Sequence, residues 1–564
     1  MHSYDYWLII GVAALVLVPA PWLGRFYFRV MEGQPTVVGR VLGPVERGCY
    51  RLAAIDPARQ QNWRAYLGAL LAFNLAGLAL LFALLMLQGW LPLNPQHLPG
   101  LEWTLALNTA VSFVTNTNWQ AYSGEASLSY LSQMAGLGVQ NFVSAATGLA
   151  VLAALCRGIA SRGGASLGNF WADLTRATLY GLLPLCLVFA VVLVWQGVPQ
   201  TFSAYVPAVT VQGADQLIPL GPVASQIAIK QLGTNGGGFF GVNSAHPFEN
   251  PTALSNLFEL AAILCIPAAL VFMFGHYVKD LRQSRAILAS MLVLLAVGAG
   301  VALWAEFQPN AALSAANLAL EPSLEGKESR FGTTATTLWA VITTAASNGS
   351  VNGMHDSLNP LAGMVAMVNM MLGEVIFGGV GAGLYGMLLF VLTAVFLAGL
   401  MIGRTPEYLG KKLQATEVRL LVATLLVMPV ATLLPAALAA ALPSTPAGLN
   451  NPGPHGFSEL LYAYVSAAAN NGSAFGGLSA NTAVHNLLLA LAMMIGRFGY
   501  IIPVIALAGC LAAKKPAPAG IDSFPTHGPL FVALLTLTIV LVGGLTFLPA
   551  LALGPIADQL THAF

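Results

Sequence analysis

Four short clusters of Thr, Asn, Ser and Gly recur along the chain, each after an apolar stretch. Their neutral oxygens, together with backbone carbonyls that glycine leaves accessible, can replace the hydration shell of a monovalent cation. No Asp or Glu interrupts a cluster, whereas a ring of carboxylates would favour a divalent ion. The candidate ligands are Thr115, Asn116, Thr117, Asn118 and Gln120; Thr234, Asn235, Gly236 and Gly237; Ser347, Asn348 and Gly349; and Asn470, Asn471 and Gly472.

The clusters repeat at similar spacing. They recur at intervals of 119, 113 and 123 residues when they are aligned on Thr115, Thr234, Ser347 and Asn470. A single cluster is equally consistent with a tight turn, but four at matching positions indicate the internal repeats of a transport fold. Non-helical backbone at membrane depth is tolerated only where it is buried in protein or lines a watery cavity. We therefore expect the four segments to meet on one axis.

The order of helix and cluster indicates the sign of the ion. Each cluster follows its apolar stretch, so the C-terminal end of that short helix points at the cluster. This end carries partial negative charge, which favours a cation. An anion pathway would need helix N-termini there instead.

The composition predicts the elements that hold these clusters. The 564 residues are 57% hydrophobic and only 8% charged, against about 25% charged in soluble domains. A spanning helix needs about 20 mostly apolar residues, and ten segments qualify: 6–24, 66–88, 128–155, 175–195, 254–277, 286–305, 364–402, 418–441, 482–512 and 527–550. We expect an all-α integral membrane protein with ten transmembrane helices. Four pseudo-repeated helix–pore loop–helix units would surround a central pore, with one extra helix at each end.

The basic residues test this count. Nineteen of the 23 Lys and Arg residues fall in the loops after the first, third, fifth, seventh and ninth segments. By the positive-inside rule those loops are cytoplasmic, and both termini are then extracytoplasmic. The expected units are 1–64 (extra helix and Arg-rich loop), pore repeats 65–156, 174–278, 286–403 and 417–513, and 523–564 (extra helix).

A second group of candidates lies below the clusters. Glu374 falls inside the seventh segment beside the glycine-rich stretch Gly378, Gly379 and Gly381, and Arg497 lies deep in the ninth. Charged side chains at membrane depth are costly and usually functional. We expect Glu374 to attract cations, the glycines to open the helix into a loop, and Arg497 to form an electrostatic barrier or pair with Glu374. The alternatives are a hydrogen bond between helices for Glu374 and snorkelling for Arg497.

Several function classes are excluded or disfavoured. The chain has no GxxxxGK[ST] loop, no P-type phosphorylation segment and no cytoplasmic stretch long enough for a nucleotide domain. It has no HExxH motif, so an intramembrane enzyme is disfavoured. The net charge of +1 gives no sign of a nucleic-acid partner. We therefore expect no nucleotide to be bound by this chain.

Long motifs resemble the potassium-binding subunit family of Kdp-type potassium-transporting ATPases, within the superfamily of potassium transporters, over essentially the whole chain. The motifs include FVTNTNWQAYSGE (Phe113–Glu125), IKQLGTNGGGFF (Ile229–Phe240), NSAHPFENP (Asn243–Pro251), GEVIFGGVGAGLYGM (Gly373–Met387), AANNGSAFGGL (Ala468–Leu478) and GRFGYIIP (Gly496–Pro503).

The resemblance implies that the ion is potassium, bound by the filter residues only. It implies a bacterial plasma (inner) membrane location, and as partners a P-type ATPase catalytic subunit, small accessory membrane subunits and the lipid bilayer. It links Gln120 to selectivity and the region of Glu374 to gating and lateral passage of the ion. Family members vary in the third loop, where Cys often stands near Asn348. The alternative function is a self-sufficient Trk- or Ktr-like potassium channel or symporter.

Overall fold

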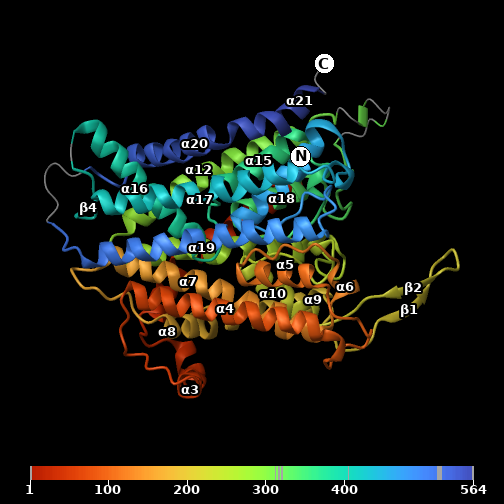
Figure 1. The fold of residues 1–564 in the computed structure, drawn as a ribbon, viewed down its shortest axis with the longest axis horizontal. Helices are drawn as coiled ribbons and strands as arrows, with labels where there is room; N and C mark the ends of the chain where they lie inside the picture. The colour runs from red at the N-terminus through yellow and green to blue at the C-terminus, as the bar shows by residue number, and fades with distance from the viewer. Residues whose placement is uncertain are drawn as a thin grey trace.

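The computed structural model describes residues 3–310, 313–314, 318, 322–403, 405–517 and 524–561. Arg404, one of the basic loop residues, lies outside them, as do residues 523 and 562–564 of the last expected unit. The described chain is helical apart from two small hairpins. Its long helices run side by side along the horizontal axis of Figure 1.

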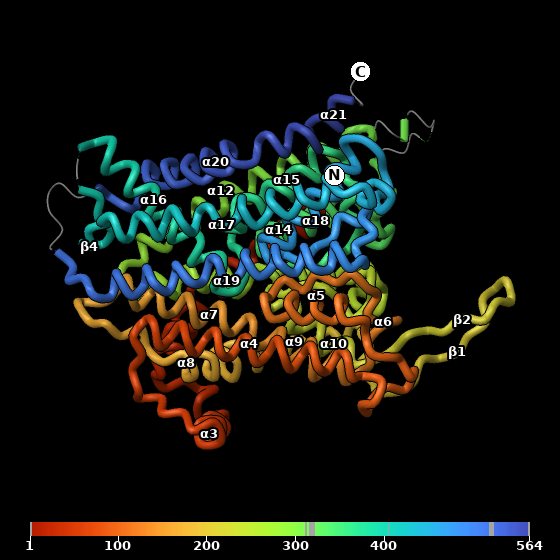
Figure 2. The backbone as a smooth tube through the Cα atoms, in the orientation of Figure 1, coloured from red at the N-terminus to blue at the C-terminus, as the bar shows by residue number. Residues whose placement is uncertain are grey.

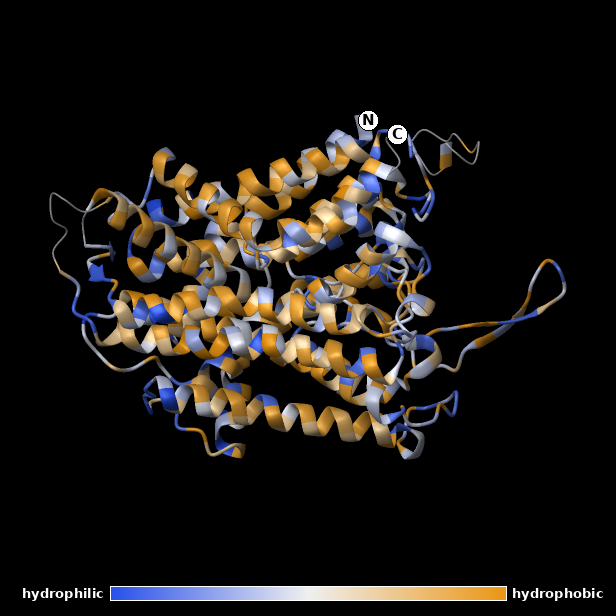
Figure 3. Ribbon diagram, turned by 45° about the horizontal axis from the view of Figure 1, so that its top comes forward, coloured by the Kyte–Doolittle hydropathy of each residue, from blue (hydrophilic) through white to orange (hydrophobic). Residues whose placement is uncertain are grey.

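Ten helical segments of the described residues are long and apolar enough to cross a membrane, which confirms the predicted number. They are Ser3–Met31, Trp63–Trp90, Ser132–Ala160, Phe170–Gln196, Ala253–Val278, Leu281–Glu306, Ala382–Ile402, Ala415–Ala440, Ala483–Ala513 and Pro529–Thr561. Apolar residues cover these segments and hydrophilic residues gather at the two ends of the bundle (Figure 3).

The labels of Figure 1 subdivide these segments. In chain order the longer helices are α1 (Ser3–Leu17), α2 (Ala20–Met31), α4 (Trp63–Leu87), α7 (Val139–Ala160), α8 (Phe170–Arg176), α9 (Leu183–Gln196), α11 (Ala253–Val278), α12 (Leu281–Glu306), α16 (Ala382–Ile402), α17 (Ala415–Ala440), α19 (Ala483–Ala513) and α20 (Pro529–Leu551). Of the residues in an apolar 18-residue stretch of the segments around α7 and α11, 83% and 78% are buried inside the protein. These two helices therefore form the centre of the bundle, and most others present one face to lipid.

Four shorter helices end inside the bundle and do not cross it. They are α5 (Trp103–Val114), α10 (Val223–Leu232), α14 (Gly332–Ala345) and α18 (Gly453–Ala469). Each ends at one of the four polar clusters, so we call them pore helices. Every residue of α5 from Thr104 to Val114 except Leu107 is buried, because spanning helices and the other pore helices surround it.

The predicted segment 364–402 is not one continuous helix, and it opens beside the glycines where a loop was expected. The structure has α15 (Pro360–Met371), a non-helical segment at 372–381, and then α16. We call residues 372–381 the crossing segment. Five of them have positive φ: Gly373, Glu374, Phe377, Gly378 and Gly381. L-residues in that conformation cannot continue a right-handed helix, so the chain opens into a loop at membrane depth.

Two further features extend beyond the bundle. The predicted Arg-rich loop contains an amphipathic helix, α3 (Val37–Leu52), whose N-cap Thr36 accepts a hydrogen bond from the Gly39 amide. A hairpin of β1 (Val206–Val209) and β2 (Asp215–Ile218) projects from one end of the bundle (Figure 2). We call this the hairpin end. The small hairpin of β3 (Glu407–Tyr408) and β4 (Lys411–Lys412) lies at the opposite end.

The remaining elements are short. They are α6 (Gly124–Ser127), α21 (Ala557–Thr561), and the 3-10 or π segments Gln88–Trp90, Ser132–Gly138, Ala177–Leu182, Asn243–Ala245, His355–Ser357, Pro446–Gly448 and Ala552–Ile556.

His455, on the first turn of α18, links this pore helix to the turn His355–Ser357 and to α21. Its Nε2 lies 3.0 Å from Asp356 Oδ1 in the turn His355–Ser357, and its Nδ1 lies 2.8 Å from Asp558 Oδ2 in α21. Hydrogen bonds with Asp356 and Asp558 raise the pKa of His455 to about 10. The protonated imidazolium therefore fastens the C-terminal segment to a pore helix.

We predict that this contact makes stability depend on pH. The pKa of His455 rises from 6.5 to about 10 on folding, so its contribution is complete below about pH 6.5 and is lost as the pH rises toward 10. The unfolding temperature of the detergent-purified protein should fall over this range, and His455→Gln should flatten the fall. His97→Asn, at an exposed position, is the control. Equal pH slopes for wild type and His455→Gln would contradict the prediction.

Candidate functional site

All four pore helices terminate in the same way. In each helix a backbone amide beyond the last turn donates to the carbonyl five residues before it. The bonds run from Thr117 to Ser112, Asn235 to Lys230, Asn348 to Thr343 and Asn471 to Ser466, each at 2.9 Å. The residue before each donor has positive φ: Asn116, Thr234, Ser347 and Asn470. This is a Schellman termination, normally made with glycine. The chain thus leaves each helix in the same direction, toward its neighbours.

This geometry changes the alignment of the repeats. The structurally equivalent residues are Asn116, Thr234, Ser347 and Asn470, so the predicted alignment on Thr115 is wrong by one residue in the first loop. Thr115 instead caps α5, and its hydroxyl lies 2.8 Å from the Val111 carbonyl oxygen. The error arose because Thr115 matches Thr234 in residue type, whereas the turn is set by backbone conformation.

The first and second loops are joined by side-chain amides. Asn116 Nδ2 donates to the Thr234 carbonyl at 3.1 Å, and Asn118 Nδ2 donates to the Gly236 carbonyl at 3.2 Å. Gln120 makes a reciprocal pair with Gly238: its Nε2 donates to the carbonyl at 3.0 Å, and its Oε1 accepts from the amide at 2.8 Å. Gln120 therefore clamps two neighbouring loops.

The third and fourth loops close the circle. Asn348 Nδ2 donates to the Lys230 carbonyl at 2.9 Å, which joins the third loop to the second pore helix. The Ser347 hydroxyl donates to the Asn470 carbonyl at 3.1 Å. Asn470 Nδ2 donates to Thr117 Oγ1 at 2.9 Å, which brings the fourth loop back to the first. The predicted cluster residues are therefore brought together in one closed ring.

Glycine is required where the loops touch. A Cβ on Gly236 would overlap the Gly349 backbone, one on Gly349 would overlap the Asn471 carbonyl, and one on Gly472 would overlap the Thr117 carbonyl. Gly236 and Gly472 also have φ of +80° and +93°. The ring thus packs backbone against backbone, which places several carbonyl groups at close quarters.

A funnel opens from the ring toward the hairpin end. This cavity of about 440 Å³ is lined by residues of all four loops, among them Gln120, Gly237, Gly349 and Gly472. Lys327 and Glu328 also line it. Lys327 is buried and forms a 3.0 Å ion pair with the buried Glu306, so its charge is compensated beside the funnel.

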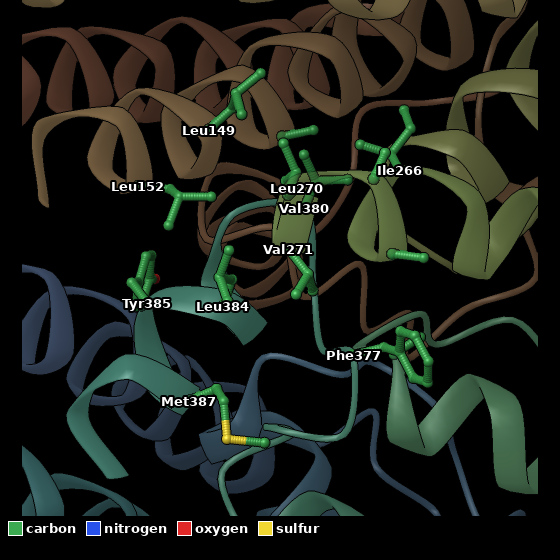
Figure 4. Close-up of a cluster of buried hydrophobic side chains, with 14 of the residues drawn as sticks. Leu149, Leu152, Ile266, Leu270, Val271, Phe377, Val380, Leu384, Tyr385 and Met387 are labelled. Atoms are coloured by element: carbon green, nitrogen blue, oxygen red, sulfur yellow. The ribbon is translucent and has the colours of Figure 1, made fainter. Parts of the chain in front are cut away.

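The crossing segment lies on the other side of the ring. The Val380 amide donates to Thr234 Oγ1 at 2.8 Å, and the Gly378 amide donates to the Ala345 carbonyl at 2.9 Å. A Cβ on Gly381 would overlap the Gly148 carbonyl of α7. In Figure 4 Val380 and Phe377 lie among buried side chains that include Leu149, Ile266 and Leu270. The segment is therefore wedged between the second loop and the central helices.

Glu374 and Arg497 share a small space under the third and fourth loops. A cavity of about 40 Å³ is lined by Ser347, Glu374, Asn470 and Arg497, among others. Asn471 Nδ2 donates to Glu374 Oε1 at 2.6 Å, and Arg497 Nη2 donates to the Ser144 carbonyl at 3.0 Å. Among the described residues no ion pair joins Glu374 to Arg497. The pairing alternative is therefore wrong, because α7 holds the guanidinium instead.

Some residues of the site were missed at the sequence level. Asn141 and Ser144, on the face of α7 that meets the ring, bond Asn118 and Asn116 at 2.6 and 2.7 Å. The sequence did carry a signal for them, because Asn141, Ser144 and Gly148 recur every three to four residues in an otherwise apolar helix and so share one face. Lys230 is a fully buried pore-helix residue paired with the buried Glu249, and this pairing was not predicted from the sequence.

The Lys230–Glu249 pair supports the second loop. Glu249 Oε1 also accepts a 2.9 Å hydrogen bond from the Phe240 amide, just beyond the glycines of the loop. The Lys230 backbone carbonyl is the acceptor for Asn348 described above. One buried pair thus links the helix that precedes the loop, the chain that follows it and the neighbouring loop.

We predict that a single substitution in the Lys230–Glu249 pair destabilises the protein much more than a double substitution does. Lys230→Met leaves the Glu249 charge buried and unpaired and should lower the free energy of unfolding by about 3–5 kcal/mol. Adding Glu249→Gln removes that charge and keeps an oxygen for the Phe240 amide, so most of the loss should be recovered. Unfolding of the purified proteins in detergent measures both. Equal losses in the single and double variants would contradict the prediction.

Known proteins can be compared with this geometry. The family profile described as "Potassium-transporting ATPase A subunit" matches residues 10–560. Potassium-transporting ATPase potassium-binding subunits of Pseudomonas fluorescens (strain Pf0-1) and Pseudomonas aeruginosa are 74% and 72% identical over 564 residues, with both chains fully covered. That of Rhodospirillum centenum is 61% identical and covers 98% of this chain and 96% of its own.

The fold also resembles a solved structure of low sequence identity. The potassium transporter TrkH from Vibrio parahaemolyticus matches with a TM-score of 0.51 at 14% identity, over 90% of this chain and 98% of the other. This likeness supports the fold alone. The family is shown by the full-length sequence matches: the chain belongs to the KdpA family, the non-catalytic, potassium-binding A subunits of bacterial membrane-embedded potassium-transporting ATPases.

Proposed function

We propose that the ring of four loops is the potassium filter of this subunit. Its ligands would be backbone carbonyls and neutral side-chain oxygens of Thr115, Asn116, Thr117, Asn118, Gln120, Thr234, Asn235, Gly236, Gly237, Ser347, Asn348, Gly349, Asn470, Asn471 and Gly472. The observation that carries the proposal is the closed circle of inter-loop hydrogen bonds, because it holds four loops of uncharged oxygens around one centre.

Electrostatics favour a cation at that centre. Four pore helices end at the ring, and each C-terminus contributes partial negative charge. Two buried lysines beside the ring are neutralised: Lys230 by Glu249 and Lys327 by Glu306. Carbonyls held at a fixed radius can replace the hydration shell of the ion, which is how potassium filters select.

We further propose that the ion enters through the funnel and passes the crossing segment toward a partner. The gate would be the crossing segment with Gly378, Gly379 and Gly381, Glu374 would attract the ion, and Arg497 would block its direct descent. The partners would be a P-type ATPase catalytic subunit, which hydrolyses ATP, and small accessory membrane subunits. The hairpin end would then be extracytoplasmic, as would both termini, in the bacterial plasma membrane. The units 1–64, 65–156, 174–278, 286–403, 417–513 and 523–564 remain the proposed division of the chain.

We predict that Gly236→Ala disables the filter. The added methyl would overlap the Gly349 backbone at a φ of +80°, so the loops must separate. The cost of about 1–3 kcal/mol for such backbone strain corresponds to a rise of about 5- to 150-fold in the half-saturation constant for potassium. Uptake by the whole complex in cells lacking other potassium importers measures this.

Gly300→Ala is the matched control, because nothing lies within 4 Å of its Cβ position in α12. It should transport as wild type does. Wild-type affinity in Gly236→Ala would refute the filter assignment, provided that the protein is present at normal levels in the membrane.

We predict that Glu374→Gln slows transport while it preserves the fold. Glutamine keeps an oxygen for Asn471 Nδ2, so only the negative charge is lost. Potassium-stimulated ATPase activity of the complex should fall about tenfold, equivalent to about 1.4 kcal/mol, with nucleotide affinity unchanged. Glu325→Gln, at an exposed position, is the control. Unaltered potassium-stimulated turnover would remove Glu374 from the ion path.

A further inference from the structure

A groove separates α12 from α20 at the end of the bundle opposite the hairpin. Its volume is about 810 Å³. Its walls are Ala286, Ala289 and Val293 of α12 and Val532, Ala533, Thr536 and Leu537 of α20, and its mouth is formed by Arg282, Arg285, His527, Gly528 and Pro529. The two helices remain joined beside it by a 2.8 Å hydrogen bond between Ser290 and Thr536 and a 2.9 Å bond from Gln283 to Thr526.

The floor and the mouth differ in chemistry. The groove exists because Ala286, Ala289 and Ala533 have small side chains. Val293 and Leu537, at its rim, have exposed fractions of 45% and 67%. The mouth carries basic side chains. Arg282 is exposed, and its guanidinium forms a 3.0 Å ion pair with Asp280. Asp280 also caps α12, because its carboxylate accepts a hydrogen bond from the Arg282 amide. Arg285 is exposed, and no acidic side chain of the described residues lies within ion-pair distance of it.

Two helices begin at the mouth, of which α12 is already capped by Asp280 and α20 has no acidic cap. α12 begins at Leu281 and α20 begins at Pro529, so both N-termini lie at the mouth. The N-cap of α20 is Gly528, which has no side chain to satisfy the first amides. Free amides and the helix dipole attract anions, above all phosphate groups.

The size of the groove argues against a spanning helix as its occupant. Its walls cover eight residues of α12, or about 12 Å at about 1.5 Å per residue. A transmembrane helix crosses about 30 Å of hydrocarbon, so most of its length would lie outside the groove. A groove of this depth, apolar inside and cationic at the membrane surface, matches one leaflet of a bilayer.

We propose that this groove binds one anionic phospholipid. The phosphate would be held by Arg282, Arg285 and His527 at the mouth, and an acyl chain would lie along the apolar floor between α12 and α20. The assignment of this end to the cytoplasmic leaflet rests on the proposed topology, but binding itself does not depend on the potassium filter.

The test is native mass spectrometry of the full-length protein released from nanodiscs of dioleoyl-phosphatidylglycerol or dioleoyl-phosphatidylcholine. Phosphatidylglycerol should be retained preferentially, as one tightly held molecule. Each arginine near the membrane surface contributes about a fivefold factor in affinity, so the double variant Arg282→Gln, Arg285→Gln should bind it about 25-fold more weakly. The control Arg59→Gln removes an exposed basic residue of the predicted cytoplasmic face outside the groove and should change nothing.

A second variant separates the two halves of the ligand. Ala289→Trp fills the floor without changing charge and should also release the lipid. Displacement by inorganic phosphate alone, equal retention of the two lipids, or unchanged binding in the double variant would each overturn the proposal. Occupation of the groove by an accessory membrane subunit in the purified complex would overturn it as well. Intact potassium transport in a variant that has lost the lipid would leave the filter assignment unaffected.

Discussion

Backbone that leaves a helix inside a membrane must find its hydrogen-bond partners within the protein, and the rest of this structure follows from that requirement. Asparagine and glutamine side chains meet it here. Asn116, Asn118, Gln120 and Asn470 each reach a group on a neighbouring loop, and Asn348 reaches the neighbouring pore helix. The same bonds that satisfy buried groups also fix the distances between loops. Stability and the geometry of the ring are therefore set by one group of contacts.

Hydropathy and basic-residue counts predicted the spanning helices because lipid imposes a length and a composition on each one separately. The polar clusters predicted the loops for a similar local reason. The pairing of residues 118 positions apart could not be predicted, because it depends on how four helices meet. Lys230 shows the limit: its sequence neighbours do not reveal that Glu249 lies beside it. The break at Glu374 was expected from its glycines, but its full extent was not, since a positive φ at Phe377 has no residue-type signature.

The four pore helices end with the same backbone geometry, but the side chains around their loops differ from repeat to repeat. The second loop is supported by a buried ion pair and by Thr234, which bonds the crossing segment. The third and fourth loops border the cavity that contains Glu374 and Arg497. The first loop rests on polar residues of α7. Similar units thus account for the ring, whereas the crossing segment and the cavity on its far side are built from features that only some units possess.

The single bond between the Val380 amide and Thr234 Oγ1 has a thermodynamic consequence. Thr234 belongs to the ring and Val380 to the segment beneath it, so neither can change conformation without affecting the other's hydrogen bond. If the ring is the potassium filter proposed above, anything that shifts the crossing segment would by linkage alter the affinity of the loops for the ion, and a bound ion would bias the segment by the same free energy. Tight capture and onward release of an ion are then opposite ends of one equilibrium.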